Sequence, residues 1–91
     1  MPHTASAHRL NSAPAQRYYF DINDGTEVRD EIGRVLEGGE ILRAEALRVI
    51  TRLTAAEAEE ARETTLVLAV RDQVGKTALK VRIVCQLEEA V

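Results

Sequence analysis

The strongest constraint on the fold is an alternation of apolar and polar side chains near the C-terminus. Two alternating runs, 65–71 and 76–87, flank the stretch Asp72-Gln73-Val74-Gly75. Asp in the first position and Gly in the last favour a type I turn. We therefore expect the two runs to form a β-hairpin, because alternation puts every second side chain on the same face of a strand.

The turn also suggests which residues lie opposite each other. If Arg71 faces Lys76, then Leu68 faces Leu79 and the apolar side chains of both runs gather on one face. These side chains are Leu66, Leu68, Val70, Leu79, Val81, Ile83, Cys85 and Leu87. A slip of one residue would turn this face toward solvent, so the pattern indicates the core side of the hairpin.

A second alternating run, RYYFDI at 17–22, leads into Asn23-Asp24-Gly25. Asn, Asp and Gly tolerate the backbone conformations of tight turns, so we expect a strand followed by a turn. Alternate residues from Tyr18 should face the core, which leaves Asp21 on the exposed face. Residues 26–30 are expected to return as a second, short strand.

The middle of the chain has helical spacing. We expect the extended part to end at Gly38-Gly39 and a helix to begin near Gly39 or Glu40. An apolar stripe follows, extended on one side by Leu47, and consists of Leu42, Ala46, Val49, Ile50 and Leu53. Thr54-Ala-Ala-Glu57 resembles a capping box, which favours a break at Thr54. One continuous helix stays open as the alternative, since the alanines that follow favour it.

These elements predict an α+β domain of order β-β-α-β-β. One main helix should pack on one face of a small antiparallel sheet. Residues 17–91 would form this single domain. Residues 1–16 contain few large apolar side chains and are expected to be a disordered tail.

Composition argues against several classes of protein. The chain has 91 residues and a formal charge of −3, so one domain is the limit. A single cysteine, Cys85, allows no internal disulfide and no Cys-pair metal site. No stretch is long and apolar enough for a membrane span, and the N-terminus lacks the apolar core of a signal peptide. We expect a cytoplasmic protein that does not bind membranes.

Catalysis is not supported by the residue types. Both histidines, His3 and His8, lie in the expected tail, and residues 17–91 contain neither His nor Ser. The commonest general base is therefore missing from the domain. The acids from Asp21 onward fail the calcium-loop pattern, because Gly25, Thr26 and Ile32 stand at three of the positions that the pattern fixes. We predict that the protein is not an enzyme and holds no cofactor or metal.

One surface is less ordinary. The hairpin face away from the apolar stripe carries basic residues and no acids, and an aromatic could join it from the first strand. This candidate nucleic-acid or partner face consists of Tyr19, Arg71, Lys76, Lys80 and Arg82. Basic side chains beside an aromatic on an open sheet can hold single-stranded nucleic acid. Against this, residues 18–91 hold 15 acidic and 10 basic residues, a balance of −5, whereas phosphate binding favours basic domains.

The order of short motifs resembles a family of short bacterial proteins that consist of one domain of unknown function and open with a strand of the form R-Y-F-F-D. The matching residues are Arg17 to Asp21, Asp24-Gly25, Asp30, Gly33, Arg43 to Ala46, and Val70-x-Asp72-x-x-Gly75. The resemblance covers about residues 17–87, and it implies no activity, cofactor or catalytic residue. This chain departs from the family in its extra N-terminal segment and in Gly38-Gly39, where the family shows a helix-capping residue.

The function expected from the sequence is a non-catalytic module for protein–protein interaction that associates with itself, as a homodimer, or with another protein partner. The alternative is an accessory protein that binds nucleic acid through the basic face.

Overall fold

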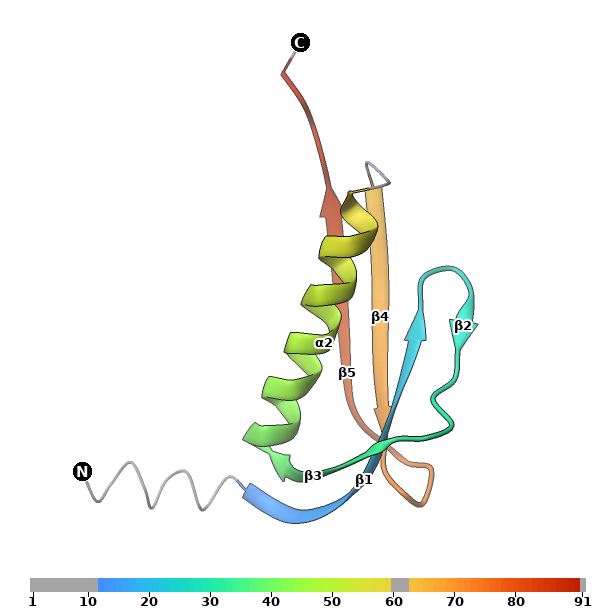
Figure 1. The fold of residues 1–91 in the computed structure, drawn as a ribbon, viewed down its shortest axis with the longest axis vertical. Helices are drawn as coiled ribbons and strands as arrows, with labels where there is room; N and C mark the ends of the chain where they lie inside the picture. The colour runs from blue at the N-terminus through green and yellow to red at the C-terminus, as the bar shows by residue number, and fades with distance from the viewer. Residues whose placement is uncertain (1–11, 60–62, 91) are drawn as a thin grey trace, which may run out of the picture.

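The computed structural model describes residues 12–59 and 63–90. Its elements are β1 (Ser12–Asn23), β2 (Glu27–Val28), β3 (Arg34–Gly39), α2 (Glu40–Ala58), β4 (Glu63–Arg71) and β5 (Thr77–Gln86). The strands form one antiparallel sheet, and α2 lies along one of its faces (Figure 1). The α+β class and the helix-on-sheet arrangement predicted from the sequence are confirmed.

The sheet has the order β2-β1-β4-β5, and β3 pairs with β1 as well. β1 is shared among three neighbours: residues 12–18 pair with β3, residues 19–23 with β4, and Ile22 and Asn23 also with β2. The first and last thirds of the chain therefore meet side by side at β1 and β4. β5 lies at the edge of the sheet.

β1 begins at Ser12, so the expectation of a tail up to residue 16 is wrong for 12–16. Residues 1–11 lie outside the described part of the chain. The extra length of β1 pairs with β3, for example Ala15 with Glu37. Pro14, which has no N–H to donate, lies where the register shifts between Ala13 and Ala15. Residues 12–16 are in a strand because their backbone pairs with β3. Their side chains do not alternate between apolar and polar, so the sequence pattern did not predict the strand.

The return from the first turn also differs from the expectation. The second strand shrinks to Glu27–Val28, and a further strand, β3, forms at Arg34–Gly39. The observed order is therefore β-β-β-α-β-β. Between the pairs Ile22–Val28 and Tyr18–Arg34, β1 has three residues and the returning chain has five, 29–33. Because of these two extra residues, the segment 29–33 bulges out opposite the middle of β1 and interrupts the returning strand. We call this segment the bulge.

The C-terminal hairpin has the predicted faces but a different register. Leu68 pairs with Val81, not with Leu79, a displacement of two residues that keeps the side chains from Leu79 to Cys85 on their predicted faces. Gly75 donates to the carbonyl of Asp72 at 3.0 Å, the expected turn, but Asp72 also donates to the carbonyl of Lys76 at 2.8 Å. The loop is thus longer, with Gly75 at φ 89°, and a register shift follows between Val70 and Arg71.

Helix α2 starts at Glu40, as predicted, directly after Gly39 with its positive φ of 66°. It continues through Thr54 to Ala58, so the favoured break at Thr54 is wrong and the continuous alternative is right. The Thr54 hydroxyl donates to the carbonyl of Ile50 at 2.7 Å and is buried. Because the helix's own backbone accepts this hydrogen bond, the threonine does not cap a new helix.

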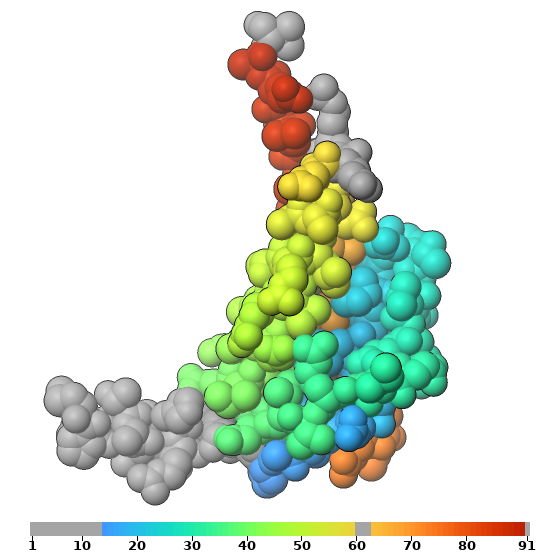
Figure 2. Space-filling view, viewed as in Figure 1, coloured from blue at the N-terminus to red at the C-terminus, as the bar shows by residue number. Residues whose placement is uncertain are grey.

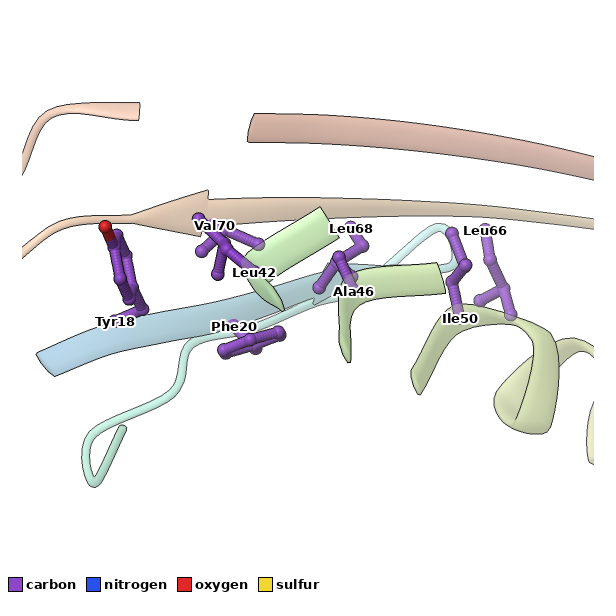
Figure 3. Close-up of a cluster of buried hydrophobic side chains, with 8 residues drawn as sticks. All are labelled: Tyr18, Phe20, Leu42, Ala46, Ile50, Leu66, Leu68 and Val70. Carbon is purple, nitrogen blue, oxygen red and sulfur yellow. The ribbon is translucent and has the colours of Figure 1, made fainter. Parts of the chain in front are cut away.

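The core lies between α2 and the sheet (Figure 3). Its buried apolar members are Tyr18, Phe20, Leu42, Ala46, Ile50, Leu66, Leu68 and Val70. The helical stripe is centred on Ile50 and Thr54, whereas Leu53 and Leu47 are 36% and 45% exposed. Leu87, expected in the core, lies beyond the end of β5 and is 49% exposed.

Candidate interaction face and its supporting network

We call the sheet face opposite α2 the outer face. The structure places Tyr19 and Arg71 directly opposite each other on β1 and β4. The Arg71 guanidinium carbon lies 4.7 Å from the centroid of the Tyr19 ring. Lys80 pairs with Ala69 and Arg82 with Val67, one strand further out. Four of the five predicted face residues therefore share one surface, while Lys76 lies in the hairpin turn and is exposed.

Arg71 also forms an ion pair on this outer face. Its Nε donates to Asp21 Oδ2 at 2.6 Å and its Nη2 to Asp21 Oδ1 at 3.2 Å. The Asp21 side chain is only 10% exposed, so the expectation that Asp21 lies exposed on its strand is wrong. The register of β1 on β4 brings the two side chains together from positions 50 apart in the sequence.

Asp30 holds the bulge in place. Its Oδ2 accepts a hydrogen bond from the backbone N–H of Phe20 at 3.0 Å, at the point where β1 faces the bulge. Its Oδ1 accepts from the N–H groups of Ile32 and Gly33, each at 3.0 Å. One carboxylate thus bonds three backbone donors of the bulge and of the strand it faces.

The two acids and the arginine are joined into one set, which we call the Asp21–Asp30–Arg71 network. The Asp30 N–H donates to Asp21 Oδ1 at 2.9 Å, and Arg71 Nη2 donates to the Asp30 carbonyl at 2.8 Å. The network ties β1, the bulge and β4 together. Asp21 and Asp30 belong to the motifs of the family that the sequence resembles, but nothing in the sequence pointed to their contact with each other or with Arg71.

Both carboxylates favour the ionised form. Burial raises the pKa of Asp21, but the hydrogen bond from Arg71 and that from the Asp30 backbone outweigh it, so the pKa is lowered. For Asp30, burial also raises the pKa, and the N–H groups of Gly33, Phe20 and Ile32 more than reverse this. The pKa of Arg71 is raised, chiefly by its bond to Asp21. Both carboxylates are therefore ionised at neutral pH, Asp21 as the ion-pair partner of Arg71, and neither acid is held ready to release or take up a proton.

Gly33 is required where the bulge ends. Its φ is +71°, and a Cβ placed on it would lie 2.7 Å from the carbonyl oxygen of Tyr18. Residues that have a side chain rarely adopt this backbone angle, and a Cβ atom essentially never lies so close to an oxygen. The glycine therefore allows the bulge to lie against β1.

A second group of charged side chains lies between β3 and the helix. Arg34 Nη1 lies 2.6 Å from Glu45 Oε2, and Arg48 Nη2 lies 3.1 Å from Glu45 Oε1. The guanidinium of Arg34 also stacks 4.6 Å from the Phe20 ring centroid. Glu45 thus joins α2 to β3, close to the aromatic edge of the core.

The Asn23 and Asp24 side chains have a structural role in the first turn, as the turn interpretation predicted. Gly25 N–H donates to Asn23 Oδ1 at 2.9 Å and Thr26 N–H to Asp24 Oδ1 at 3.2 Å. Within residues 12–59 and 63–90, no three His, Cys, Asp or Glu side chains gather as metal ligands would. The same part of the chain has no helix with the length and apolarity needed to cross a membrane.

The outer face carries both signs of charge. A groove of about 380 Å³ is lined on one side by Asp21 and Glu27 and on the other by Lys80 and Arg82. Ala69 and Val67 form its floor, half-buried between the two charged sides. This arrangement suits a partner that itself carries both charges better than it suits a run of phosphates.

A feature that the sequence did not indicate is the incomplete cover of β5. On the core side, the β4 residues Leu66, Leu68 and Val70 are buried, whereas Leu79, Val81 and Ile83 of β5 are only partly buried. On the outer face, Val84 is 61% exposed. Among the described residues β5 pairs with β4 alone, so its second edge has no strand beside it. Alternation reports which face a residue lies on, but it does not report whether the strand is central or at an edge.

The chain matches the model of a known protein family. The model of the domain of unknown function DUF6894 matches residues 17–84, most of the domain described above. No curated protein and no solved structure gives a significant match.

Proposed function

The chain belongs to the DUF6894 family, a domain of unknown function, and we propose that it is a non-catalytic, cytoplasmic protein-interaction module that associates with itself. The carrying observation is β5. It is a ten-residue strand at the edge of the sheet. On both of its faces, its apolar side chains are more exposed than those of the neighbouring strand β4.

Edge strands of this length are unusual without protection. Natural sheets shield their edges with short strands, bulges or charges that point toward the core. β5 has a register shift near its start and two basic side chains on the outer face, but its core side consists of Leu79, Val81, Ile83 and Cys85. Apolar side chains beside unpaired backbone groups are the features that recruit another strand.

The use of the acids supports a non-catalytic role. Asp21 and Asp30 are bonded to an arginine and to backbone N–H groups, and Asp24 and Asp72 bond the backbone of turns. A general base needs a pKa near the working pH, whereas the pKa values of Asp21 and Asp30 are lowered below the ordinary value. These motif acids stabilise the fold.

Sedimentation velocity over a concentration series tests the proposal. We expect the full chain to shift from monomer toward dimer as its concentration rises from micromolar to millimolar. A chain that stays monomeric throughout the series would contradict self-association. A substrate screen that finds turnover abolished by a single side-chain replacement would contradict the non-catalytic role.

The second candidate function is binding of single-stranded nucleic acid, favoured by the exposure of Lys76, Lys80 and Arg82 near one surface. The other two members of the basic face support it less, because Arg71 is bonded to Asp21 and lies over the ring of Tyr19. A salt titration with single-stranded oligonucleotides tests it. Binding at low salt that weakens with salt and is lost in Lys80→Glu/Arg82→Glu would support this candidate, and no binding at low salt would exclude it.

A further inference from the structure

We infer that two copies of this chain pair through β5, antiparallel and related by a two-fold axis at Val84, so that their sheets become one. This inference rests on the proposed self-association and names the surface and the register that produce it. The partner is a second copy, and its β5 fills the place beside the unpaired edge of β5.

The choice of edge follows from the topology. At the other side of the sheet, β2 has two residues and the bulge at 29–33 separates it from β3. An interrupted edge offers no continuous row of backbone groups to a new strand. β5 offers ten residues, and the chain continues beyond it from Leu87 as an extension that projects past the sheet (Figure 2).

The charges disfavour some of the possible registers. In an antiparallel pair related by a two-fold axis, the residue at the axis lies opposite its own copy. Residues at equal distances before and after the axis lie opposite each other, with their side chains on the same face of the sheet. An axis at Val81 would put Lys80 opposite Arg82, and an axis at Arg82 would put that arginine opposite its own copy. Like charges directly opposite each other destabilise a strand pair, so these two registers are disfavoured.

An axis at Ile83 would also avoid the conflict, but it would leave Lys80 opposite Gln86, whereas an axis at Val84 gives Lys80 an acidic partner. Lys80 then lies opposite Glu88 of the second copy, and Arg82 lies opposite Gln86. This complementarity requires the strand to extend by two residues beyond Gln86, where the chain carries no helix or strand of its own.

The same register covers the exposed apolar groups. Val84, 61% exposed, meets its own copy on the outer face, and Leu87, 49% exposed, lies opposite Val81 on the core side. Ile83 lies opposite Cys85, and both are half-buried in one chain. The groove of about 540 Å³ between α2 and β5, beside Thr54 and Ile83, borders the part of β5 that this register pairs.

The first test uses a charge at the axis. Val84→Lys places two lysines opposite each other in the dimer, and we expect the dissociation constant to rise at least tenfold. Val28→Lys is the matched control, because Val28 is also 61% exposed but lies on β2; it should dimerise like the wild type. Lys80→Glu should weaken the dimer several-fold through two symmetry-related pairs, and Lys80→Glu/Glu88→Lys should restore it.

The second test is cross-linking in full-length chains that carry Cys85→Ala. Val84→Cys should form a disulfide between copies under mild oxidation, because residues at the axis lie directly opposite each other. Lys80→Cys should not, since its partner in this register is Glu88. Circular dichroism confirms that each variant is folded before it is compared.

The outcomes separate the two proposals. A wild-type chain that stays monomeric at all concentrations overturns both. A wild-type dimer that is unaffected by Val84→Lys and does not cross-link through Val84→Cys overturns the β5 pairing while self-association stands. A dimer weakened by Val84→Lys and cross-linked at position 84 but not at position 80 supports the inferred register.

Discussion

Arg71 donates two hydrogen bonds to Asp21, at 2.6 and 3.2 Å, and thereby fastens the N-terminal strand to the C-terminal hairpin. The pair lies on the sheet face that α2 leaves uncovered, yet the Asp21 side chain is only 10% exposed. The bulge beside it contributes the N–H and the carbonyl of Asp30 to the same two side chains. The outer face thus carries the exposed charges of Lys80 and Arg82 and, next to them, the hydrogen-bonded ion pair of Asp21 and Arg71.

The first prediction concerns this ion pair. Asp21→Asn removes the charge that Arg71 faces and one of the acceptors it uses, so we expect the free energy of unfolding to fall by about 2 kcal/mol. Asp24→Asn is the control, since Asp24 is exposed and its Oδ1 acceptor is kept by the amide. Urea unfolding followed by circular dichroism measures both variants. Equal stabilities for Asp21→Asn and the wild type would show that the network does not stabilise the fold.

The second prediction is the dependence of stability on pH. The folded-state pKa values of Asp21 and Asp30 lie below the ordinary value of 3.8, so the unfolded chain binds protons first as the pH falls. The stabilisation is therefore fully present above about pH 4 and is lost as the pH drops through the folded-state values. Urea midpoints measured from neutral pH down to about pH 2 should fall steeply at the acid end.

Asp30→Asn provides the comparison for the acid limb. This variant should be less stable at neutral pH, and its midpoint should change less between neutral and acid pH than that of the wild type. The wild type and Asp30→Asn losing stability in parallel through the acid range would contradict the assignment of the acid limb to this network.

The third prediction concerns Gly33. Gly33→Ala combines a positive φ with a Cβ that would lie 2.7 Å from the Tyr18 carbonyl oxygen, and we expect a loss of about 2–4 kcal/mol. Gly75→Ala has the same kind of backbone strain, at φ +89°, but no atom within 4 Å of the new Cβ. It should lose about 1–2 kcal/mol. Thermal unfolding of the two variants separates the close contact from the strain, and an equal loss in both would argue against the contact.

The fourth prediction tests the centre of the helical stripe. Ile50 is fully buried while Leu53 is 36% exposed, although the sequence placed both on the core stripe. Ile50→Ala should cost about 2–5 kcal/mol through lost burial and the cavity left behind, and Leu53→Ala about 1 kcal/mol or less. Denaturant unfolding at equal m-values gives the comparison. A larger cost for Leu53→Ala would mean that the helix is rotated from the observed position.

The candidate site predicted from the sequence and the site in the structure differ for one reason. Arg71, Lys80 and Arg82 share one face as expected, because alternation within a strand is a local property, and Tyr19 joins them because β1 pairs with β4. That Asp21 joins this face and binds Arg71 depends on β1 lying beside β4 in one particular register. Residues 21 and 71 carry no mark of each other in the sequence. The signal that existed was an acid and a base at outward positions of two predicted strands, and many such pairs never meet.

The hairpin and the helix show the same limit at shorter range. Alternation fixed the faces of β4 and β5, but a loop one residue longer and a register shift moved the pairing by two residues, from Leu68–Leu79 to Leu68–Val81. Gly38-Gly39 indicated the start of α2, and helical spacing indicated most of its buried side. Packing against the sheet then buried Thr54 in place of Leu53 and kept the helix continuous.

The sequence by itself determined the class of the domain, the start of the helix and the faces of its strands, because backbone geometry repeats every two or 3.6 residues and side-chain polarity follows that repeat. Only the tertiary structure decided that residues 12–16 join β1, that Asp21, Asp30 and Arg71 form one network, and that β5 is left at an edge. These features depend on which backbone groups and charges meet across long stretches of chain, and that is settled by competition among pairings in the folded protein.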